Sequence, residues 1–135
     1  MTKPNDFSGM WRVTYWYPSN DRPGEEESTG YYCEARQRGD KVVFESVAER
    51  PDHMVVNVTV DHSLVTGNWT ENTDPNGEFE GIEYSGALQL LVKDNGARLD
   101  GKWVGVGREK LEDGSYQPQI YSGRWEMTRA GSQTS

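Results

Sequence analysis

The chain has 135 residues, of which 27% are charged and 11% aromatic, and its formal net charge is −8. A chain of this size and mixture is typical of one soluble globular domain, and its acidic balance argues against a nucleic-acid-binding surface, which needs clustered basic residues. The single cysteine, Cys33, excludes an internal disulfide, and no apolar run suggests a membrane helix or a secretory signal. We therefore expect a cytoplasmic protein with neither a nucleic-acid nor a membrane partner.

Short segments rich in Val, Tyr, Thr and Trp alternate with turn residues along the chain, which is typical of an all-β domain. In chain order, the predicted strands are residues 9–17, 30–37, 41–47, 54–60, 64–72, 78–92, 98–107 and 120–129. The acidic segment SNDRPGEEESTG before the second strand and the segment 108–119 before the last strand are predicted to be loops. Asp94-Asn95-Gly96 is a strong hairpin signal between the sixth and seventh strands.

These strands indicate a single closed architecture. No segment shows helical spacing over three turns, and most strands are joined by short turns. Closing eight such strands into a ring removes the exposed sheet edges. We predict a single eight-stranded antiparallel up-and-down β-barrel over residues 9–129, with a lead-in over 1–8 and a disordered tail over 130–135.

Four of the five tryptophans follow a glycine by two residues, in SGMW, TGNW, DGKW and SGRW. In a strand, residues two apart lie on the same face of the sheet, so each motif places a bare backbone beside the largest side chain. Glycine weakens a strand and therefore needs a packing reason, which a small barrel filled by alternating small and large residues supplies. We predict that Trp11, Trp69, Trp103 and Trp125 face the interior.

The first of these motifs, preceded by Phe7, resembles the Gly-x-Trp signature of the calycin superfamily, which includes lipocalins, fatty-acid-binding proteins and avidins. The resemblance implies that Trp11 closes one end of the barrel and that a basic residue of the last strand, Arg124 or Arg129, packs across it. Trp125 belongs to the same predicted closure.

A longer stretch, from Val65 to Met127, resembles a β-rich domain appended to some bacterial helix-turn-helix transcription regulators. The shared features are Gly-Lys-Trp-Val-Gly, a Tyr-x-Gly-Ala-x-Gln-Leu-Leu run and a closing Gly-x-Trp-Glu, in that order. The resemblance implies a bacterial sensory or effector-binding domain, and it implies no particular ligand.

Motifs for catalysis, metals and cofactors are not evident. The two histidines lack the spacing of a metal or haem site, and neither a Gly-x-Ser-x-Gly elbow nor a dinucleotide-binding motif in its strand–helix context occurs. Glu71, Glu80 and Glu83 are candidate paired carboxylates, but strand parity places Glu80 and Glu83 on opposite faces. We expect no enzyme, no cofactor and no metal.

Two functions remain, together with the alternative that the aromatic rings only fill a dry core. The first is a non-catalytic small-molecule-binding barrel whose rings stack on a heteroaromatic or nucleotide-like compound, with Arg108 meeting an anionic group. The second is a protein–protein interaction module that acts through its acidic loops or as a homo-oligomer. The residues predicted to bind the ligand are Tyr15, Tyr17, Trp69, Tyr84, Gln89, Trp103 and Arg108.

Overall fold

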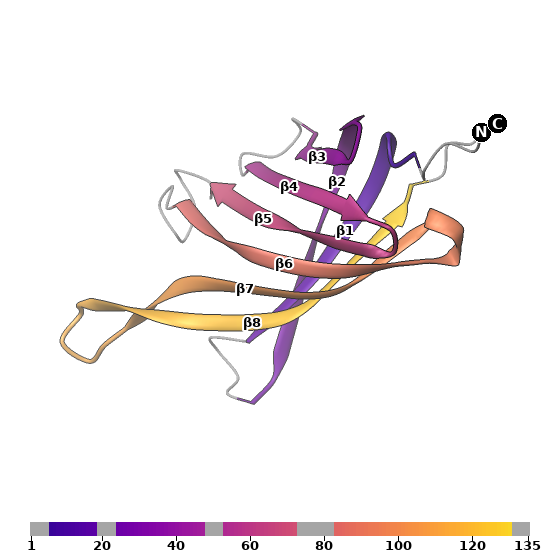
Figure 1. Cartoon of the computed structure of the whole chain (residues 1–135). Coiled ribbons are helices and arrows are strands. Elements are labelled where there is room, and N and C mark those ends of the chain that lie inside the picture. The colour runs from indigo at the N-terminus through magenta and orange to yellow at the C-terminus, as the bar shows by residue number, and fades with distance from the viewer. Residues whose placement is uncertain (1–5, 19–23, 48–52, 73–82, 131–135) are drawn as a thin grey trace.

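A computed structural model describes residues 6–18, 24–47, 53–72 and 83–130, without the side chains of 108–110. Eight strands form one closed barrel in which sequence neighbours pair and β8 pairs with β1, always antiparallel (Figure 1). The strands are β1 Gly9–Pro18, β2 Glu26–Arg38, β3 Lys41–Ser46, β4 His53–Asp61, β5 Leu64–Asn72, β6 Glu83–Lys93, β7 Arg98–Lys110 and β8 Tyr116–Arg129. The predicted all-β, eight-stranded up-and-down barrel is confirmed.

Two predicted loops are partly wrong, because strands continue through polar sequence. Within the segment 108–119, β7 runs to Lys110 and β8 begins at Tyr116, and these two residues are cross-strand partners. In the acidic segment, Glu26 already belongs to β2 and pairs with Pro18. Neither extension has a buried face, so it lacks the alternating pattern from which half-buried strands are recognised. Residues 78–82 of the predicted sixth strand lie outside the described residues.

The barrel has two different ends. Tight turns join β2 to β3, β4 to β5 and β6 to β7 at one end, where β1 begins and β8 finishes; we call this the tight-turn end. The turn between β6 and β7 is a short 3-10 segment, η1 (Asp94–Gly96), in which Asn95 has a φ of 56°, as the hairpin signal predicts. The opposite end, where β1 finishes and β2 begins, is called the loop end.

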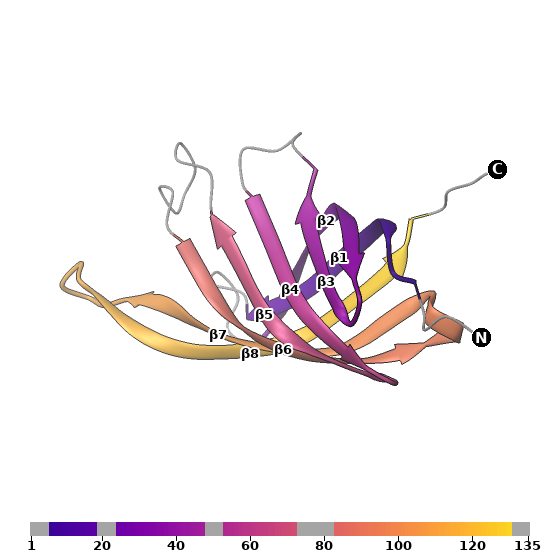
Figure 2. The same cartoon turned by 45° about the horizontal axis from the view of Figure 1, so that its top comes forward.

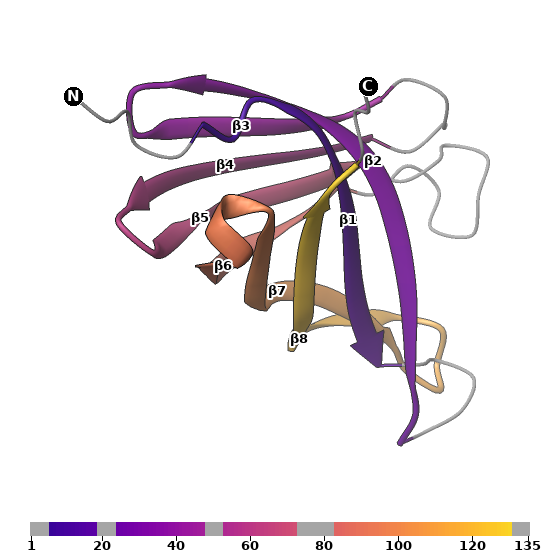
Figure 3. The same ribbon diagram turned by 90° about the vertical axis from the view of Figure 1, so that its right-hand side faces the viewer.

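At the loop end, two hairpins reach beyond the closed part of the barrel. Among the described residues, β6 pairs with β7 only as far as Gly86–Gly105, and β8 pairs with β1 only as far as Trp125–Tyr15. The rest of β7 and β8 forms a two-stranded extension, which we call the β7–β8 arm (Figures 1 and 2). Strands β1 and β2 likewise pair well past the end of β3. Figure 3 shows these two strands extending away from strands β3, β4, β5 and β6.

The tight-turn half of the interior is a dry hydrophobic core. Alternate residues of every strand point inward there, and most of their side chains have almost no contact with solvent, apart from the half-buried Val60 and Val92 at the mouth. The fully buried members include Trp11, Val13, Val42, Phe44, Val65, Leu90, Leu99 and Met127, and burial continues on β4 through Val56 to Met54, the cross-strand partner of Glu71. Burial of this kind stabilises the fold by roughly 1.5–3 kcal/mol for each large side chain, so this half of the molecule holds the barrel together.

The Gly-x-Trp motifs on β7 and β8 fit into each other. Their antiparallel register pairs Gly101 with Trp125 and Trp103 with Gly123, and a Cβ placed on Gly123 would lie 2.8 Å from the Trp103 Nε1. Trp69 repeats this arrangement across two strands, because a Cβ placed on Gly86 or Gly105 would lie 2.9 or 2.5 Å from its ring. A tryptophan of such a motif therefore follows a glycine on its own strand and also covers a glycine on a neighbouring strand.

The motif at Trp11 closes the tight-turn end. The Trp11 Nε1–H donates to the Phe7 carbonyl over 2.7 Å, and the Arg129 guanidinium lies over the Trp11 ring at 4.8 Å from its centroid. Arg129 also donates to the carbonyls of Asp6 and Ser8, which ties the lead-in segment to the last strand. Arg124, the other candidate, points outward and stacks on Trp16 instead.

Candidate functional site

Several inward-facing side chains toward the loop end retain contact with solvent, unlike most of those in the dry half. Tyr15, Tyr17 and Tyr84 are half-buried, and Trp69 and Trp103 are each 7% exposed. With Tyr31 and Trp125 they form what we call the aromatic cluster. Its members come from β1, β2, β5, β6, β7 and β8, so the cluster spans the interior at the height where the dry core ends.

Tyr15 is the centre of the cluster. Its ring stacks on Trp125 at a centroid distance of 5.2 Å and on Tyr31 at 6.4 Å, and it meets Trp103 edge-on at 6.2 Å. Trp69 meets Trp103 edge-on at 5.6 Å. Stacked and edge-to-face pairs at these distances are the favourable arrangements of aromatic rings, and they hold the cluster in one geometry.

The carboxylate of Glu71 lies among these rings. The Tyr15 hydroxyl donates to both oxygens of Glu71 over 3.1 Å, and the Tyr31 hydroxyl donates to the same group. Strand β5 lies directly across the ring of strands from β1, so these bonds cross the interior of the barrel. Hydrogen bonds to an ionised acceptor are among the stronger ones in proteins, so they fix the position of the carboxylate.

The phenol of Tyr15 stays protonated in this environment. Burial raises its pKa far above the ordinary value, and the negative charge of Glu71 and the hydrogen bond to it raise the pKa further. Tyr15 therefore acts as a hydrogen-bond donor to Glu71 throughout the physiological pH range.

The indole N–H groups of the cluster differ in whether they have a hydrogen-bond partner. The Trp103 Nε1–H donates to the carbonyl of Trp16 over 2.8 Å. The buried Nε1–H groups of Trp69 and Trp125, in contrast, have no hydrogen-bond partner among the residues that the structure describes. A buried donor without a partner costs about 1–3 kcal/mol, so these two groups mark a polar requirement within the cluster.

The structure places the predicted ligand-binding residues unevenly. Tyr15, Trp69 and Trp103 lie in the cluster, Tyr84 faces inward, and Tyr17 faces inward with its hydroxyl donating to Glu27 over 3.4 Å. The prediction for Gln89 is wrong, because Leu88 and Leu90 take the inward positions of β6.

Gln89 is therefore exposed on the outer face, where its side chain bonds to Thr66. The Arg108 backbone is part of β7 and pairs with Pro118, while its side chain is outside the described part.

The sequence interpretation named Glu71 only as a candidate paired carboxylate, and it missed both Glu71 and Tyr31 as members of the ligand site. Parity carries the signal for Glu71, since it follows the inward-facing Trp69 by two residues on β5. Parity also places Tyr31 on the face of Cys33. What parity cannot show is that Tyr31 and Glu71 meet across the barrel, because the distance across the interior depends on the closed shape.

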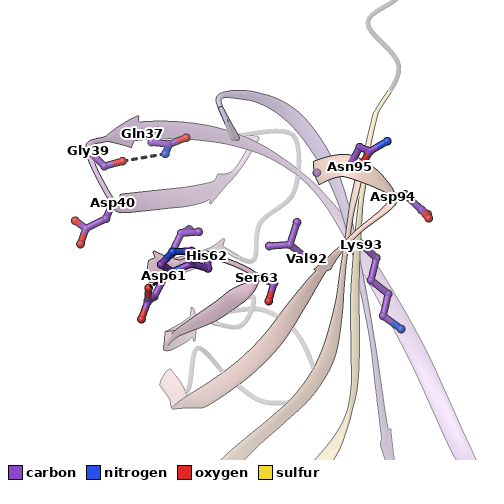
Figure 4. A pocket seen from close by; sticks show the side chains of 12 residues that line it. Gln37, Gly39, Asp40, Asp61, His62, Ser63, Val92, Lys93, Asp94 and Asn95 are labelled. Atoms are coloured by element: carbon purple, nitrogen blue, oxygen red, sulfur yellow. Dashed lines mark hydrogen bonds and ion pairs between the residues drawn. The ribbon is translucent and has the colours of Figure 1, made fainter. Parts of the chain in front are cut away.

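A hollow of about 880 Å³ opens at the tight-turn end between three turns, and the half-buried Val60 and Val92 are among its lining residues (Figure 4). Its rim is polar and includes Asp40, Asp61 and Ser63, and the side chain of Gln37 bonds to the Gly39 carbonyl beside it. None of the predicted ligand-binding residues lines it. No group of three or more His, Cys, Asp or Glu side chains arranged to hold a metal occurs in the described ranges.

Within the described ranges, no helix is long and apolar enough to span a membrane. No known family model matches the chain, and no curated protein is significantly similar to it in sequence. The arguments about function therefore rest on the barrel and on the aromatic cluster.

Proposed function

We propose that the protein is a non-catalytic, calycin-like barrel that binds a small flat molecule at its loop end. The observation that carries this proposal is the contrast between the two halves of the interior. The tight-turn half is filled by apolar side chains, with Val60 and Val92 half-buried at its mouth, whereas the loop-end half presents partly exposed rings, the Glu71 carboxylate and two buried indole donors. Apolar walls with a few convergent polar groups are typical of small-molecule sites.

The composition of the cluster favours a heteroaromatic compound. Rings in stacked and edge-on orientations offer flat contact surfaces, and the polar groups between them can orient a ring that carries nitrogen or oxygen. A nucleotide-like compound would extend its anionic group toward the end of β7, where Arg108 follows Gly107. The resemblance to domains of bacterial regulators supports a sensory use of such binding in the cytoplasm.

Native mass spectrometry of freshly purified protein, followed by titration of tryptophan fluorescence with a panel of flat metabolites, tests this function. We expect at least one compound to change the fluorescence with a dissociation constant below 1 mM. Trp69→Phe should weaken this binding, whereas Trp16→Phe, on the outer surface, should leave it unchanged. A panel without any response, together with a purified protein that carries no compound, would refute the proposal.

A second candidate function has one specific observation in its favour. On the outer face of the β7–β8 arm, Val106 and Ile120 are cross-strand partners and are 48% and 65% exposed, and Val104 is exposed beside them. An apolar patch next to a strand edge favours association, here with a second copy of the chain through its arm. Sedimentation equilibrium tests this: a dimer that Ile120→Lys converts to a monomer supports association, and a monomer at all concentrations excludes it.

A further inference from the structure

The polar groups of the aromatic cluster specify which atoms a ligand must present. Glu71 offers carboxylate oxygens, which only accept hydrogen bonds, and Trp69 offers an indole N–H, which only donates. The two residues are two apart on the same face of β5, so their Cα atoms are about 6–7 Å apart. Their side chains therefore lie next to each other on one wall of the interior.

Trp125 extends the same pattern from the opposite wall. Its ring lies 6.3 Å from Trp69 and 5.2 Å from Tyr15, whose hydroxyl bonds to Glu71. The indole N–H of Trp125 is, like that of Trp69, buried and without a partner among the described residues. One acceptor and two donors therefore surround a common set of stacked rings.

We infer that the ligand is an amino-substituted nitrogen heteroaromatic compound, which donates N–H groups to Glu71 and accepts from an indole N–H with a ring nitrogen or carbonyl. This inference rests on the proposed function and deepens it. An amino group beside a ring N–H can meet both carboxylate oxygens at once, as a guanidinium does. A ring of this kind also stacks on the tyrosine and tryptophan faces, and more strongly when it is protonated.

The tyrosines around Glu71 act as positioning residues in this arrangement. Tyr15 and Tyr31 hold the carboxylate from the side of β1 and β2. Because both hydroxyls donate, the carboxylate stays an acceptor with a fixed plane. The same charge repels an anionic group placed against it, so a carboxylate or phosphate of a ligand must point away from Glu71.

Two probes of the same size test this chemistry: 2,4-diaminoquinazoline and 2,4-dimethylquinazoline, which replaces both amino groups by methyl groups. Titrating tryptophan fluorescence, we expect the diamino compound to bind the native protein at least tenfold more tightly. Glu71→Gln should reduce this preference to less than about threefold, because the amide offers one acceptor and no charge. Tyr15→Phe, which keeps the carboxylate, should retain most of the preference.

The outcomes separate the inference from the function on which it rests. Equal binding of the two probes to the native protein overturns the inference and leaves small-molecule binding intact, and so does an unchanged preference in Glu71→Gln. Binding of another flat compound with no binding of either probe has the same meaning. The absence of binding by every compound, with no compound carried through purification, overturns both. Near-UV circular dichroism of each variant shows whether the cluster is still packed.

Discussion

The close approach of β4 and β5 at Gly67 yields the sharpest prediction about the fold. A Cβ placed on Gly67 would lie 2.6 Å from the Cα of Val58 and 2.8 Å from the carbonyl carbon of Asn57, with the carbonyl oxygen of Asn57 nearer still. Carbon atoms pack at about 3.5–4.0 Å, so Gly67→Ala requires the two backbones to separate by roughly 1 Å. Both neighbours are main-chain atoms and cannot rotate away.

The expected cost follows from three effects. Overpacking a rigid site costs about 1–3 kcal/mol, and weakening the ladder hydrogen bonds beside the Gly67–Val58 pair adds about 1 kcal/mol. Replacing glycine by alanine returns about 0.4–1 kcal/mol by restricting the unfolded chain. The net expectation is a loss of about 2 kcal/mol, or a decrease in Tm of about 8 °C for a chain of this size.

Urea unfolding followed by tryptophan fluorescence and far-UV circular dichroism measures this loss. Gly30→Ala is the matched control, because it also lies in a strand and its added Cβ would approach the Val13 carbonyl oxygen only to 3.1 Å. We expect the control to change the free energy of unfolding by less than about 1 kcal/mol. If Gly67→Ala is as stable as the control, the interpretation of the glycines as sites of close backbone approach is refuted.

Three further predictions concern other parts of the barrel. Arg129→Met removes the guanidinium from Trp11 and from the lead-in carbonyls, so it should cost about 1–2 kcal/mol in urea unfolding, and a loss no larger than that of Arg124→Met would contradict the closure role. Burial raises the pKa of the Cys33 thiol to about 12, so iodoacetamide at pH 8 should label this thiol only after unfolding. The contribution of the protonated thiol to the free energy of unfolding is complete below the unfolded pKa near 9. That contribution is lost as the pH rises toward 12. Amide hydrogens of residues 106–110 and 116–120, in the arm and apart from Pro118, should exchange faster than those of Val56 and Val58, and equal protection would contradict the arm's separate pairing.

Strand identity and facing could be predicted from the sequence wherever one face is buried. Alternation along β4, β7 and β8 correctly places Val56, Val58, Trp103 and Trp125 on the inward face, because a buried face constrains every second residue of a strand. The arm could not be predicted, since β7 and β8 leave the closed part of the barrel there and neither face of the arm is buried. The inward placement of Gln89 is wrong because its neighbours on β6, Leu88 and Leu90, face inward, and the residue between them must then face outward.

The sequence alone predicts only some of the residues of the candidate site. Individual rings could be assigned to the interior by parity, but the bonds from Tyr15 and Tyr31 to Glu71 join strands that are far apart in the chain. Such contacts depend on the barrel diameter and on how far each strand coils. Local sequence patterns contain neither quantity, so the position of the Glu71 carboxylate among the rings follows only from the three-dimensional structure.

Trp69 links the stability of the barrel to the proposed site. Its ring covers Gly86 and Gly105, and its N–H belongs to the polar pattern around Glu71. Replacing Trp69 by alanine would therefore expose two bare strands as well as remove a ligand contact, and a loss of binding could not be assigned to either cause. Glu71→Gln changes the charge and keeps the shape, while the glycines and their tryptophan covers stay in place. A change in binding at constant stability in that variant would separate recognition by the cluster from its structural role.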